Sequence, residues 1–508
     1  MHIEIDDGNL KLSDWRAAWE QDVQPELSPA ARDAVIASAR RVDELIASDR
    51  RVYGVNTGFG QLATVRIERS ELRHLQENLL RSHAAGVGAP LDDEVVRLVL
   101  LMKIVALARG YSGVGIDLVD KLCALLEHRV YPLVPAKGSV GASGDLAPLA
   151  HLAGILIGLG EARVAGRILP AGEALAAAGI GLHELRPKEG LALINGTQVS
   201  TSLALSALFR AEHVFAAALV AGALSADAIK GSDTPFDERI HHLRGHAAQA
   251  AVADCLRRLM QGSEIRHSHL DCDRVQDPYS IRCQPQVMGA CLGVMRHVAE
   301  VLATEADAVT DNPLVFADGD VLSGGNFHAE PVALAADYLA LAIAEVGALS
   351  ERRIALLIDA HLSGLPAFLV EDSGLHSGFM LPQVTAAALA AENKQLAHPA
   401  SVDSLPTSAN QEDHVSMATH AARRLDDMLG NTARIVAIEL LAAAQGVEFH
   451  HPQKSSAQLE AVIQRIRERS ARYVEDRSLA GDIENVAADV LAGRFADDAG
   501  ELLPSRHS

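Results

Sequence analysis

Residues 203–229 read LALSALFRAEHVFAAALVAGALSADAI, a long stretch rich in alanine and leucine with few charges. Alanine and leucine are strong helix formers, and a helix that is apolar on nearly all sides belongs in the interior of a protein. The stretch therefore predicts a long buried helix. Further long apolar stretches follow it at residues 287–306, 331–357, 383–395 and 414–446. Five such helices predict a helical bundle.

The composition of the 508-residue chain agrees with a helical fold. Hydrophobic residues make up 49% of the chain and aromatic residues only 4%, which suits closely packed helices better than stacked sheets. Nearer the N-terminus the helical patterns are shorter, as at residues 92–108 and after Ser28 and Pro29, which have the pattern of an N-cap and a first helical residue. We therefore expect an all-α protein with a smaller mixed N-terminal domain at residues 1–195 and a long central and C-terminal bundle at residues 196–508.

The charge of the chain argues against polyanionic partners. With 45 Lys and Arg residues against 66 Asp and Glu residues, the formal net charge is −21 at pH 7. Nucleic acid and anionic membrane surfaces would repel such a protein at long range. We expect an acidic soluble enzyme, with no nucleic acid and no membrane as partner.

The cysteines and the N-terminal residues point to the cytoplasm. The cysteines are odd in number and lack the CxxC spacing, so neither a disulfide framework nor a zinc site is expected. They are Cys123, Cys255, Cys272, Cys283 and Cys291. The first residues, MHIEIDDGNLKLSDW, are acidic and lack the apolar core of an export signal. The longest uncharged apolar runs, such as residues 214–226, are shorter than the roughly 18–20 residues that a membrane span needs.

Residues 138–151, GSVGASGDLAPLAH, form the segment with the most unusual chemistry. The amide nitrogen of Gly144 is unhindered and could approach the carbonyl carbon of Ala142 in a sharp bend, while the hydroxyl of Ser143 could leave as water. Cyclisation with dehydration would give an electrophilic ring. A plain tight turn is the simpler interpretation. A hydrolase nucleophile is disfavoured, because its Gly-x-Ser-x-Gly turn would need glycine where Asp145 stands.

The same segment resembles the signature of the ammonia-lyase and aminomutase family. The resemblance runs from about residue 52 to residue 426 and continues more loosely through residues 472–492. It implies that Ala142, Ser143 and Gly144 form 4-methylidene-imidazol-5-one autocatalytically, with no external cofactor. It also implies an all-helical homotetramer in which each active site is assembled from three chains.

Elimination of ammonia from an α-amino acid needs a base for the β-proton, an activated amine and a group that holds the carboxylate. The resemblance assigns the base to Tyr53, in the glycine-rich loop YGVNTGFG of residues 53–60, and it places Asn195 beside the ring. Without the resemblance, Tyr53 would be a packing or capping residue and Asn195 an N-cap of the helix that follows it.

Residues 275–286, VQDPYSIRCQPQ, concentrate polar and aromatic side chains before a long apolar helix. The planar guanidinium of Arg282 suits a carboxylate, because it can donate two parallel hydrogen bonds. A lone arginine in a loop is more commonly a surface salt-bridge partner. The family pattern, however, matches Gln276, Tyr279 and Arg282 together. It implies that Arg282 holds the substrate carboxylate, that Tyr279 is a catalytic residue and that Gln276 binds the substrate.

Residues 323–330, SGGNFHAE, also resemble a family loop, in which Phe327 is expected to border the ring. His328 and Glu330 have side chains that commonly bind metal ions. No second histidine lies at helical spacing from them, so we expect no metal site.

The substrate is indicated by two segments, SHAAGVG at residues 82–88 and SANQEDHVSM at residues 408–417. Both resemble the family members that act on histidine. His83 and Glu412 offer a donor-acceptor and an anion to the two nitrogens of an imidazole, whereas a phenyl ring would leave the carboxylate unpaired. Gln411 and Met380 are expected beside the substrate, although Met380 would equally suit a core position.

Together these motifs predict the elimination of ammonia from L-histidine to give trans-urocanate, the first step of histidine degradation. Two points stay open: whether the ring attacks the amine or the imidazole, and whether Tyr53 or Glu412 takes the β-proton. The alternatives are an ammonia-lyase or aminomutase for tyrosine or phenylalanine, and a helical scaffold without catalytic activity.

Overall fold

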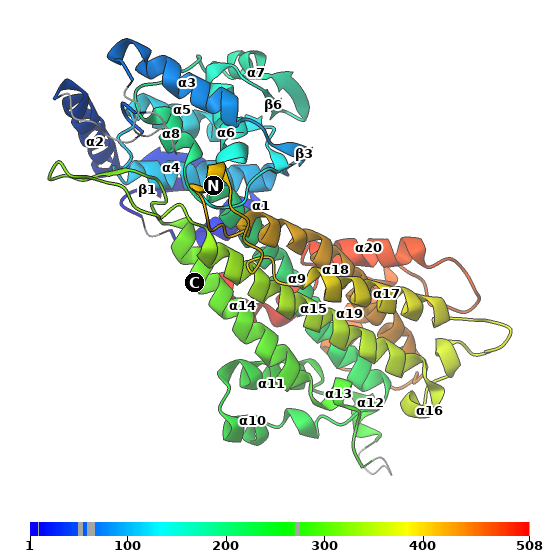
Figure 1. Cartoon of the computed structure of the whole chain (residues 1–508). Coiled ribbons are helices and arrows are strands. Elements are labelled where there is room, and N and C mark those ends of the chain that lie inside the picture. The colour runs from blue at the N-terminus through cyan, green and yellow to red at the C-terminus, as the bar shows by residue number, and fades with distance from the viewer. Residues whose placement is uncertain (9, 49–53, 58–66, 270–274, 507–508) are drawn as a thin grey trace.

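The structure is a computed structural model that describes residues 1–8, 10–48, 54–57, 67–269 and 275–506. Long, roughly parallel helices form an elongated bundle, and the N-terminal elements gather at one end of it (Figure 1). The bundle helices are α9 (Gln198–Ala228), α14 (Gln284–Ala306), α15 (Glu330–Ile358), α17 (Met380–Leu396) and α18 (Ala418–Glu448). All five long helices expected from the sequence are present, and the all-α prediction is confirmed.

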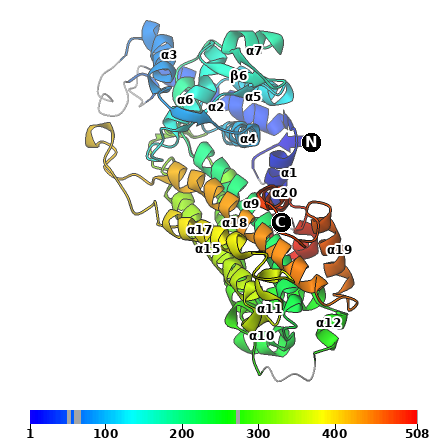
Figure 2. The same ribbon diagram turned by 90° about the vertical axis from the view of Figure 1, so that its right-hand side faces the viewer.

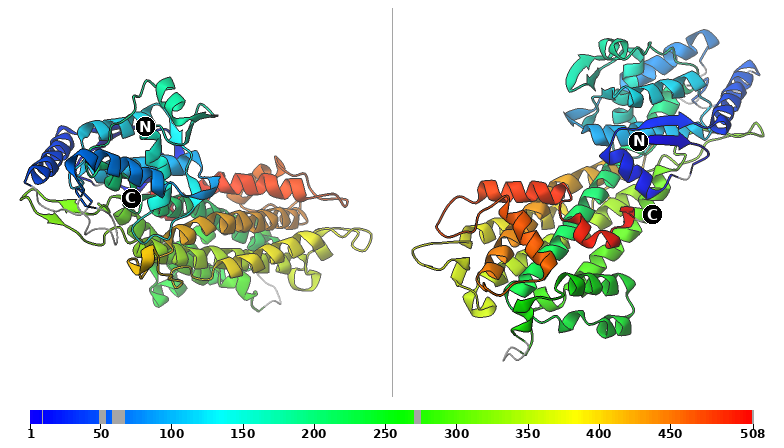
Figure 3. Two further views of the ribbon diagram at one scale, coloured as in Figure 1. Left: turned by 45° about the horizontal axis from the view of Figure 1, so that its top comes forward. Right: turned by 180° about the vertical axis from the view of Figure 1, so that it is seen from behind.

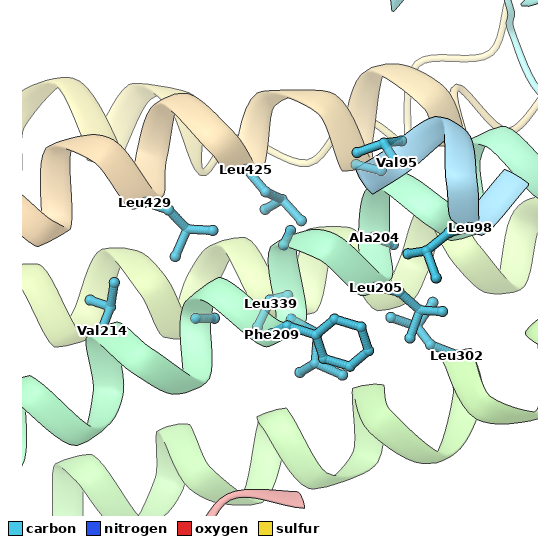
Figure 4. Packing of buried hydrophobic residues seen from close by; sticks show 14 of the residues in the cluster. Val95, Leu98, Ala204, Leu205, Phe209, Val214, Leu302, Leu339, Leu425 and Leu429 are labelled. Carbon is cyan, nitrogen blue, oxygen red and sulfur yellow. The ribbon is translucent and has the colours of Figure 1, made fainter. Parts of the chain in front are cut away.

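Helix α9 runs through the centre of the bundle. It packs against α4 (Asp93–Ala108), α14, α15 and α18, so it is covered on all sides. Figure 4 shows Leu205 and Phe209 of α9 facing Leu302, Leu339 and Leu425 of the helices around it. The many alanines of α9 have no side chain beyond Cβ, which lets the neighbouring helices approach closely.

The expected helix starts were wrong by a few residues in places. Helix α18 was expected from residue 414, but it begins at Ala418, because Met417 has a left-handed conformation with φ of 57°. Residues 414–416 therefore belong to a loop. Helices α14 and α15 begin earlier than expected, each with a proline in its first turn. Proline is tolerated there because a backbone N–H in the first turn has no hydrogen-bond partner within the helix.

The N-terminal end combines short helices with small sheets. Ser28 caps the helix that Pro29 begins, since its hydroxyl accepts a hydrogen bond from the amide of Ala31 at 3.1 Å. The helices are α1 (Leu12–Glu20), α2 (Pro29–Ala47), α3 (Leu72–His83), α4, α5 (Ile116–Glu127), α6 (Leu146–Gly154), α7 (Ala171–Ala177) and α8 (Glu189–Ile194). The strands are β1 (His2–Ile5), β2 (Gln24–Leu27), β3 (Val87–Pro90), β4 (Tyr131–Pro132), β5 (Pro135–Lys137), β6 (Glu161–Val164) and β7 (Arg167–Pro170).

Those strands form small sheets: β1 pairs with β2 in parallel, β3 pairs with β5, and β6 lies between β4 and β7. In both views of Figure 3, the N-terminal elements lie together at one end of the molecule. The change from short elements to the long bundle falls between α8 and α9, beside the boundary expected after residue 195. That boundary between two domains stays a prediction.

Shorter elements complete the bundle. Helices α10 to α13 lie at the end remote from the N-terminal elements, and α19 and α20 lie on the side of the bundle away from α15 and α17 (Figure 2). These elements are α10 (Glu238–Arg244), α11 (Ala247–Leu259), α12 (Glu264–His267), α13 (Tyr279–Arg282), β8 (Leu314–Val315), β9 (Val321–Leu322), α16 (Ala360–Ser363), α19 (Ala457–Arg467) and α20 (Ala480–Leu491). The short 3-10 turns are Arg69–Glu71, Ile155–Ile157, Thr234–Phe236, Ala367–Leu369, Ser408–Asn410, Ala496–Leu502 and Pro504–Arg506.

Helices α9, α14 and α15 are, among the described residues, long and apolar enough to cross a membrane by length and composition. They were not expected as possible membrane spans, because only uncharged runs were considered and a few charged residues interrupt each helix. The most apolar window of α9 is 89% buried inside the protein, so the core accounts for its composition. The corresponding window of α14 is only 44% buried, which leaves much of that helix facing outward.

A buried ion pair joins the three central helices. Glu439 of α18 accepts hydrogen bonds from Arg353 of α15 at 2.5 and 2.8 Å, and both residues are fully buried. Ser225 of α9 and Ser350 of α15 donate their hydroxyls to the same carboxylate. Because every oxygen of Glu439 is paired, the charge is tolerated inside the core.

Candidate active site

The Ala142, Ser143 and Gly144 triplet lies between β5 and α6, packed against the turn that precedes α9. Gly144 has φ of 77°, and a Cβ on it would lie 2.4 Å from the carbonyl oxygen of Gly196. The next amide, that of Asp145, donates to the same Gly196 oxygen at 2.8 Å. Only glycine fits at this position, so the triplet is held in a sharp bend with an unhindered nitrogen at Gly144.

Asp145 fixes the position of the triplet through hydrogen bonds to its carboxylate. Its buried carboxylate accepts hydrogen bonds from the hydroxyls of Ser139 at 2.8 Å and Thr419 at 2.7 Å. It also accepts from the amide and the hydroxyl of Ser200 at 2.7 and 2.9 Å. The loop is thereby tied to α9 and α18. The one signal for this role in the sequence is an aspartate directly after the triplet.

Asn195 contacts the triplet directly. Its side-chain nitrogen donates to the backbone carbonyl of Ser143 at 3.0 Å, and its Oδ1 is buried with no partner among the described residues. The alternative interpretation as an N-cap of the next helix was wrong, because Thr197 occupies that position. An unpaired buried oxygen beside the triplet is a place where a further polar group could be bound.

Lys103 supports the turn that carries Asn195, and the sequence analysis missed it. Its ammonium donates to the carbonyl oxygens of Asn195 at 2.8 Å and Ala192 at 3.1 Å. Burial lowers the pKa of Lys103 from 10.5 to about 8, and the nearby charge of Asp311 opposes the shift. A lysine inside the otherwise apolar helix of residues 93–108 was the signal that could have revealed it.

Glu412 reaches the triplet from the loop before α18. The hydroxyl of Ser143 donates to its Oε1 at 2.5 Å, and the hydroxyl of Thr407 donates to its Oε2 at 2.5 Å. Burial lowers the pKa of His83 below its usual 6.5, while a hydrogen bond with the backbone of Leu79 and the charge of Glu412 act in the opposite direction. The charge of Glu412 thus acts on His83, and burial favours the neutral form of the imidazole.

The loops that carry Phe327 and Gln411 are fastened to the residues just before the triplet. The amide of Ala329 donates to the carbonyl of Gly141 at 3.1 Å. The amide of Met417 donates to the carbonyl of Val140 at 2.9 Å. Phe327 is half-buried, and Gln411 is exposed next to Glu412 in the chain. Both expected residues are thus on loops that meet at the triplet.

Arg282 and its neighbours lie far from the triplet within one chain. Gln284, two residues after Arg282, donates to the carbonyl of Gly222 at 3.2 Å. Gly222 is 24 residues along α9 from Gln198, about 36 Å at 1.5 Å per residue. Tyr279 is 70% exposed, and the Arg282 guanidinium lies 4.8 Å from the centre of its ring. Gln276 is exposed as well. A single chain therefore does not bring these three residues to Ser143.

Met380 is also remote from the triplet, and Tyr53 lies outside the described residues. Met380 is the first residue of α17, and three residues later Gln383 hydrogen-bonds to Glu351, near the far end of α15. The start of α15, by contrast, is next to Gly141 through Ala329. The side chain of Met380 is exposed, so its alternative interpretation as a core residue was wrong for the isolated chain.

His328 and Glu330, expected to bind no metal, lie beside a third side chain of a type that binds metal ions. His414, from the loop before α18, brings its ligand atom within 4.8 Å of those of His328 and Glu330. Helical spacing in the sequence reveals only partners on the same helix, whereas His414 arrives on a separate loop.

Comparison with known proteins shows a family match over most of the chain. Residues 10–468 match the family described as aromatic amino acid lyase. The chain is 60% identical to histidine ammonia-lyase of Aromatoleum aromaticum over 96% of this chain and 93% of that protein.

Solved structures are similar over the whole length. The crystal structure of histidine ammonia-lyase from Trypanosoma cruzi has a TM-score of 0.91 and 40% sequence identity, covering 100% of this chain and 97% of that one. The structure of tyrosine aminomutase from Streptomyces globisporus has a TM-score of 0.93 and 34% identity, covering 99% of each chain. With its fold, its bent Ala-Ser-Gly triplet and these full-length relatives in agreement, the chain belongs to the aromatic amino acid lyase family.

Proposed function

We propose that this protein eliminates ammonia from L-histidine to give trans-urocanate. The observation that carries the proposal is the contact of Glu412 with Ser143, with His83 beside them. A neutral imidazole and a carboxylate can pair with both nitrogens of a histidine side chain. A phenyl or phenol ring would leave that carboxylate without a donor at one position, which costs binding energy. The relatives named histidine ammonia-lyase support the same substrate.

Ala142, Ser143 and Gly144 fit a self-formed 4-methylidene-imidazol-5-one group. The unhindered Gly144 nitrogen, the bend enforced by Gly196 and the unpaired Oδ1 of Asn195 are the features that support it. When formed, the ring supplies an electrophile that makes the substrate easier to deaminate. Asn195 would hold it through its amide, and no external cofactor is needed.

The remaining roles fall to other side chains. Tyr53 is the proposed base for the β-proton, with Glu412 as the competing candidate. His83 and Glu412 orient the imidazole of the substrate, and Phe327 and Gln411 border it. Arg282 binds the substrate carboxylate through its planar guanidinium.

Arg282, Tyr279, Gln276 and Met380 can take part only if a second copy of the chain supplies them, because all of them lie far from Ser143 in their own chain. We therefore propose a homotetramer with shared active sites, working in the cytoplasm. Exposed apolar side chains on α15 and α17 support such an assembly, since they form a surface that water would not favour. They are Leu334, Tyr338, Leu341, Leu381 and Val384.

The direct test is the absorbance of urocanate during incubation with L-histidine. The proposal expects product from L-histidine and none from L-tyrosine or L-phenylalanine. Glu412→Gln should lower kcat/KM by at least about 100-fold, since it removes the anion that faces the triplet. Glu4→Gln, an exposed change on β1, is the matched control and should leave activity unchanged.

Two results would overturn the proposal. Turnover of tyrosine or phenylalanine in preference to histidine would make the chain an aminomutase or lyase for those substrates. Absence of any activity in a chain whose Ser143 contacts are intact would leave only the helical scaffold.

A further inference from the structure

His328, Glu330 and His414 form a cluster that the proposed reaction does not use. His328 lies in the loop before α15, Glu330 is the first residue of α15, and His414 lies in the loop before α18. One ligand atom from each side chain lies within 4.8 Å of the other two. The two imidazole rings are 5.6 Å apart at their centres, with an angle of 35° between their planes.

The carboxylate of Glu330 lacks the partners that a buried charge needs. Its Oε2 is buried and accepts no hydrogen bond from any described residue. No described lysine or arginine forms an ion pair with it either. An unpaired buried carboxylate oxygen is costly, and binding of a cation is one of the few ways in which it can be satisfied.

The orientation of His328 leaves one ring nitrogen free. Its Nε2 is 3.2 Å from the backbone carbonyl oxygen of His414. A carbonyl oxygen can only accept, so Nε2 carries the proton and Nδ1 of the neutral ring keeps its lone pair. Histidines that bind metal ions commonly donate their other N–H to a backbone carbonyl in this way, which fixes the tautomer and the ring.

We propose that His328, Glu330 and His414 bind one divalent transition-metal ion of the zinc class. Two imidazoles and one carboxylate are a donor set that zinc accepts, and the fourth position is left to water. In a tetrahedral site with donors about 2.0–2.1 Å from the ion, the donor atoms lie about 3.3 Å from one another. The side chains must therefore rotate to bring their ligand atoms closer together than they are now. His414 is exposed and has room to do so.

The bound ion would join two loops that border the active site. It would tie the loop of Phe327 to the loop of Glu412, which is two residues from His414. Metal binding would therefore restrict the position of Glu412 without contacting the substrate. None of the three ligands takes part in the proposed lyase reaction, so zinc binding can be tested separately from that reaction.

The test is zinc binding to the full-length chain, stripped with a chelator and free of any affinity tag. Calorimetry together with metal analysis should find about one zinc ion per chain with a Kd on the order of 10 µM or tighter. His414→Ala and Glu330→Gln should each weaken binding at least about tenfold. His361→Ala removes a histidine on the remote helix α16 and is the matched control.

A crystal soaked in zinc gives a second measurement that does not depend on the folding of any variant. An anomalous difference peak between the three side chains supports the proposal. Absence of that peak, less than about 0.2 zinc ions per chain, or binding that survives both ligand substitutions overturns it. Ser143→Ala, which cannot form the ring, should bind zinc as the unmodified chain does, so failure of this site and failure of the lyase reaction can be told apart.

Discussion

Gly144 is the residue on which the proposed ring formation depends. Its φ of 77° is accessible to other residues at a modest cost, but a Cβ would lie 2.4 Å from the Gly196 oxygen. The backbone of the next segment therefore excludes any side chain. Gly144 and Gly196 can approach each other this closely because neither has a side chain.

Gly144→Ala should therefore prevent formation of the ring and destabilise the protein by about 2 kcal/mol or more, through strain and a backbone clash. Gly166→Ala is the matched control, because Gly166 has the same φ of 77° but open space around it. It should cost only about 1 kcal/mol. Denaturant unfolding of both variants measures the difference, and equal losses would show that the Gly196 contact is unimportant.

Lys103 makes the stability of the folded protein depend on pH. Its pKa is about 8 in the folded chain and 10.5 when exposed, so the unfolded state binds more protons between these values. Stability should therefore rise as the pH increases from about 8 to 10.5, by up to about 3 kcal/mol from this group. The cost of charging Lys103 is fully present below pH 8.

Comparison with Lys103→Met isolates that contribution from the other groups that titrate in alkali. The rise in melting temperature between pH 8 and 10 should be smaller in the variant than in the unmodified chain. Equal slopes for the two proteins would mean that Lys103 has an ordinary pKa and is not buried as described.

At the scale of elements, the ion pair between Arg353 and Glu439 joins the central helices. No single helix could bury either charge alone. Glu439→Gln should lower stability by about 3–5 kcal/mol, because it leaves the guanidinium of Arg353 buried without an anion. The double change Arg353→Met with Glu439→Leu should recover much of that loss, since it removes both charges. Thermal unfolding measures both effects, and a double variant less stable than Glu439→Gln would contradict the account.

The long helices could be predicted from the sequence because the helix signal is local and repeats over many residues. Apolar runs located α14 and α15 to within a few residues. The start of α18 could not be predicted, since it depends on the left-handed conformation of Met417, where the loop meets Val140. The short helix at Tyr279–Arg282 was also missed, because four residues carry no periodic signal.

The residues of the candidate site also fall into two groups, those that could be predicted from the sequence and those that could not. The triplet, Asn195, His83 and Glu412 could be predicted, because each lies in a recognisable segment of sequence. Asp145 and Lys103 were missed, because their role is visible only where distant loops meet. The third member of the histidine and glutamate cluster was missed for the same reason.

At the scale of the whole molecule, the distance between Arg282 and Ser143 predicts that chains share active sites. Ser143→Ala and Arg282→Ala should each abolish most activity when tested alone. Co-expressed chains should regain activity in sites that combine an intact Ser143 from one chain with an intact Arg282 from another, about a quarter of all sites if the chains mix at random. Co-expression that restores nothing would show that one chain supplies both residues.

The central claim is that the protein makes its own electrophile from Ala142, Ser143 and Gly144. The most direct measurement is the intact mass of an active preparation, with Ser143→Ala prepared identically as the reference for the termini. Loss of two waters should make the unmodified chain about 36 Da lighter than its sequence, while Ser143→Ala keeps its full mass and forms no urocanate. A full-mass chain that still forms urocanate from histidine would contradict the claim.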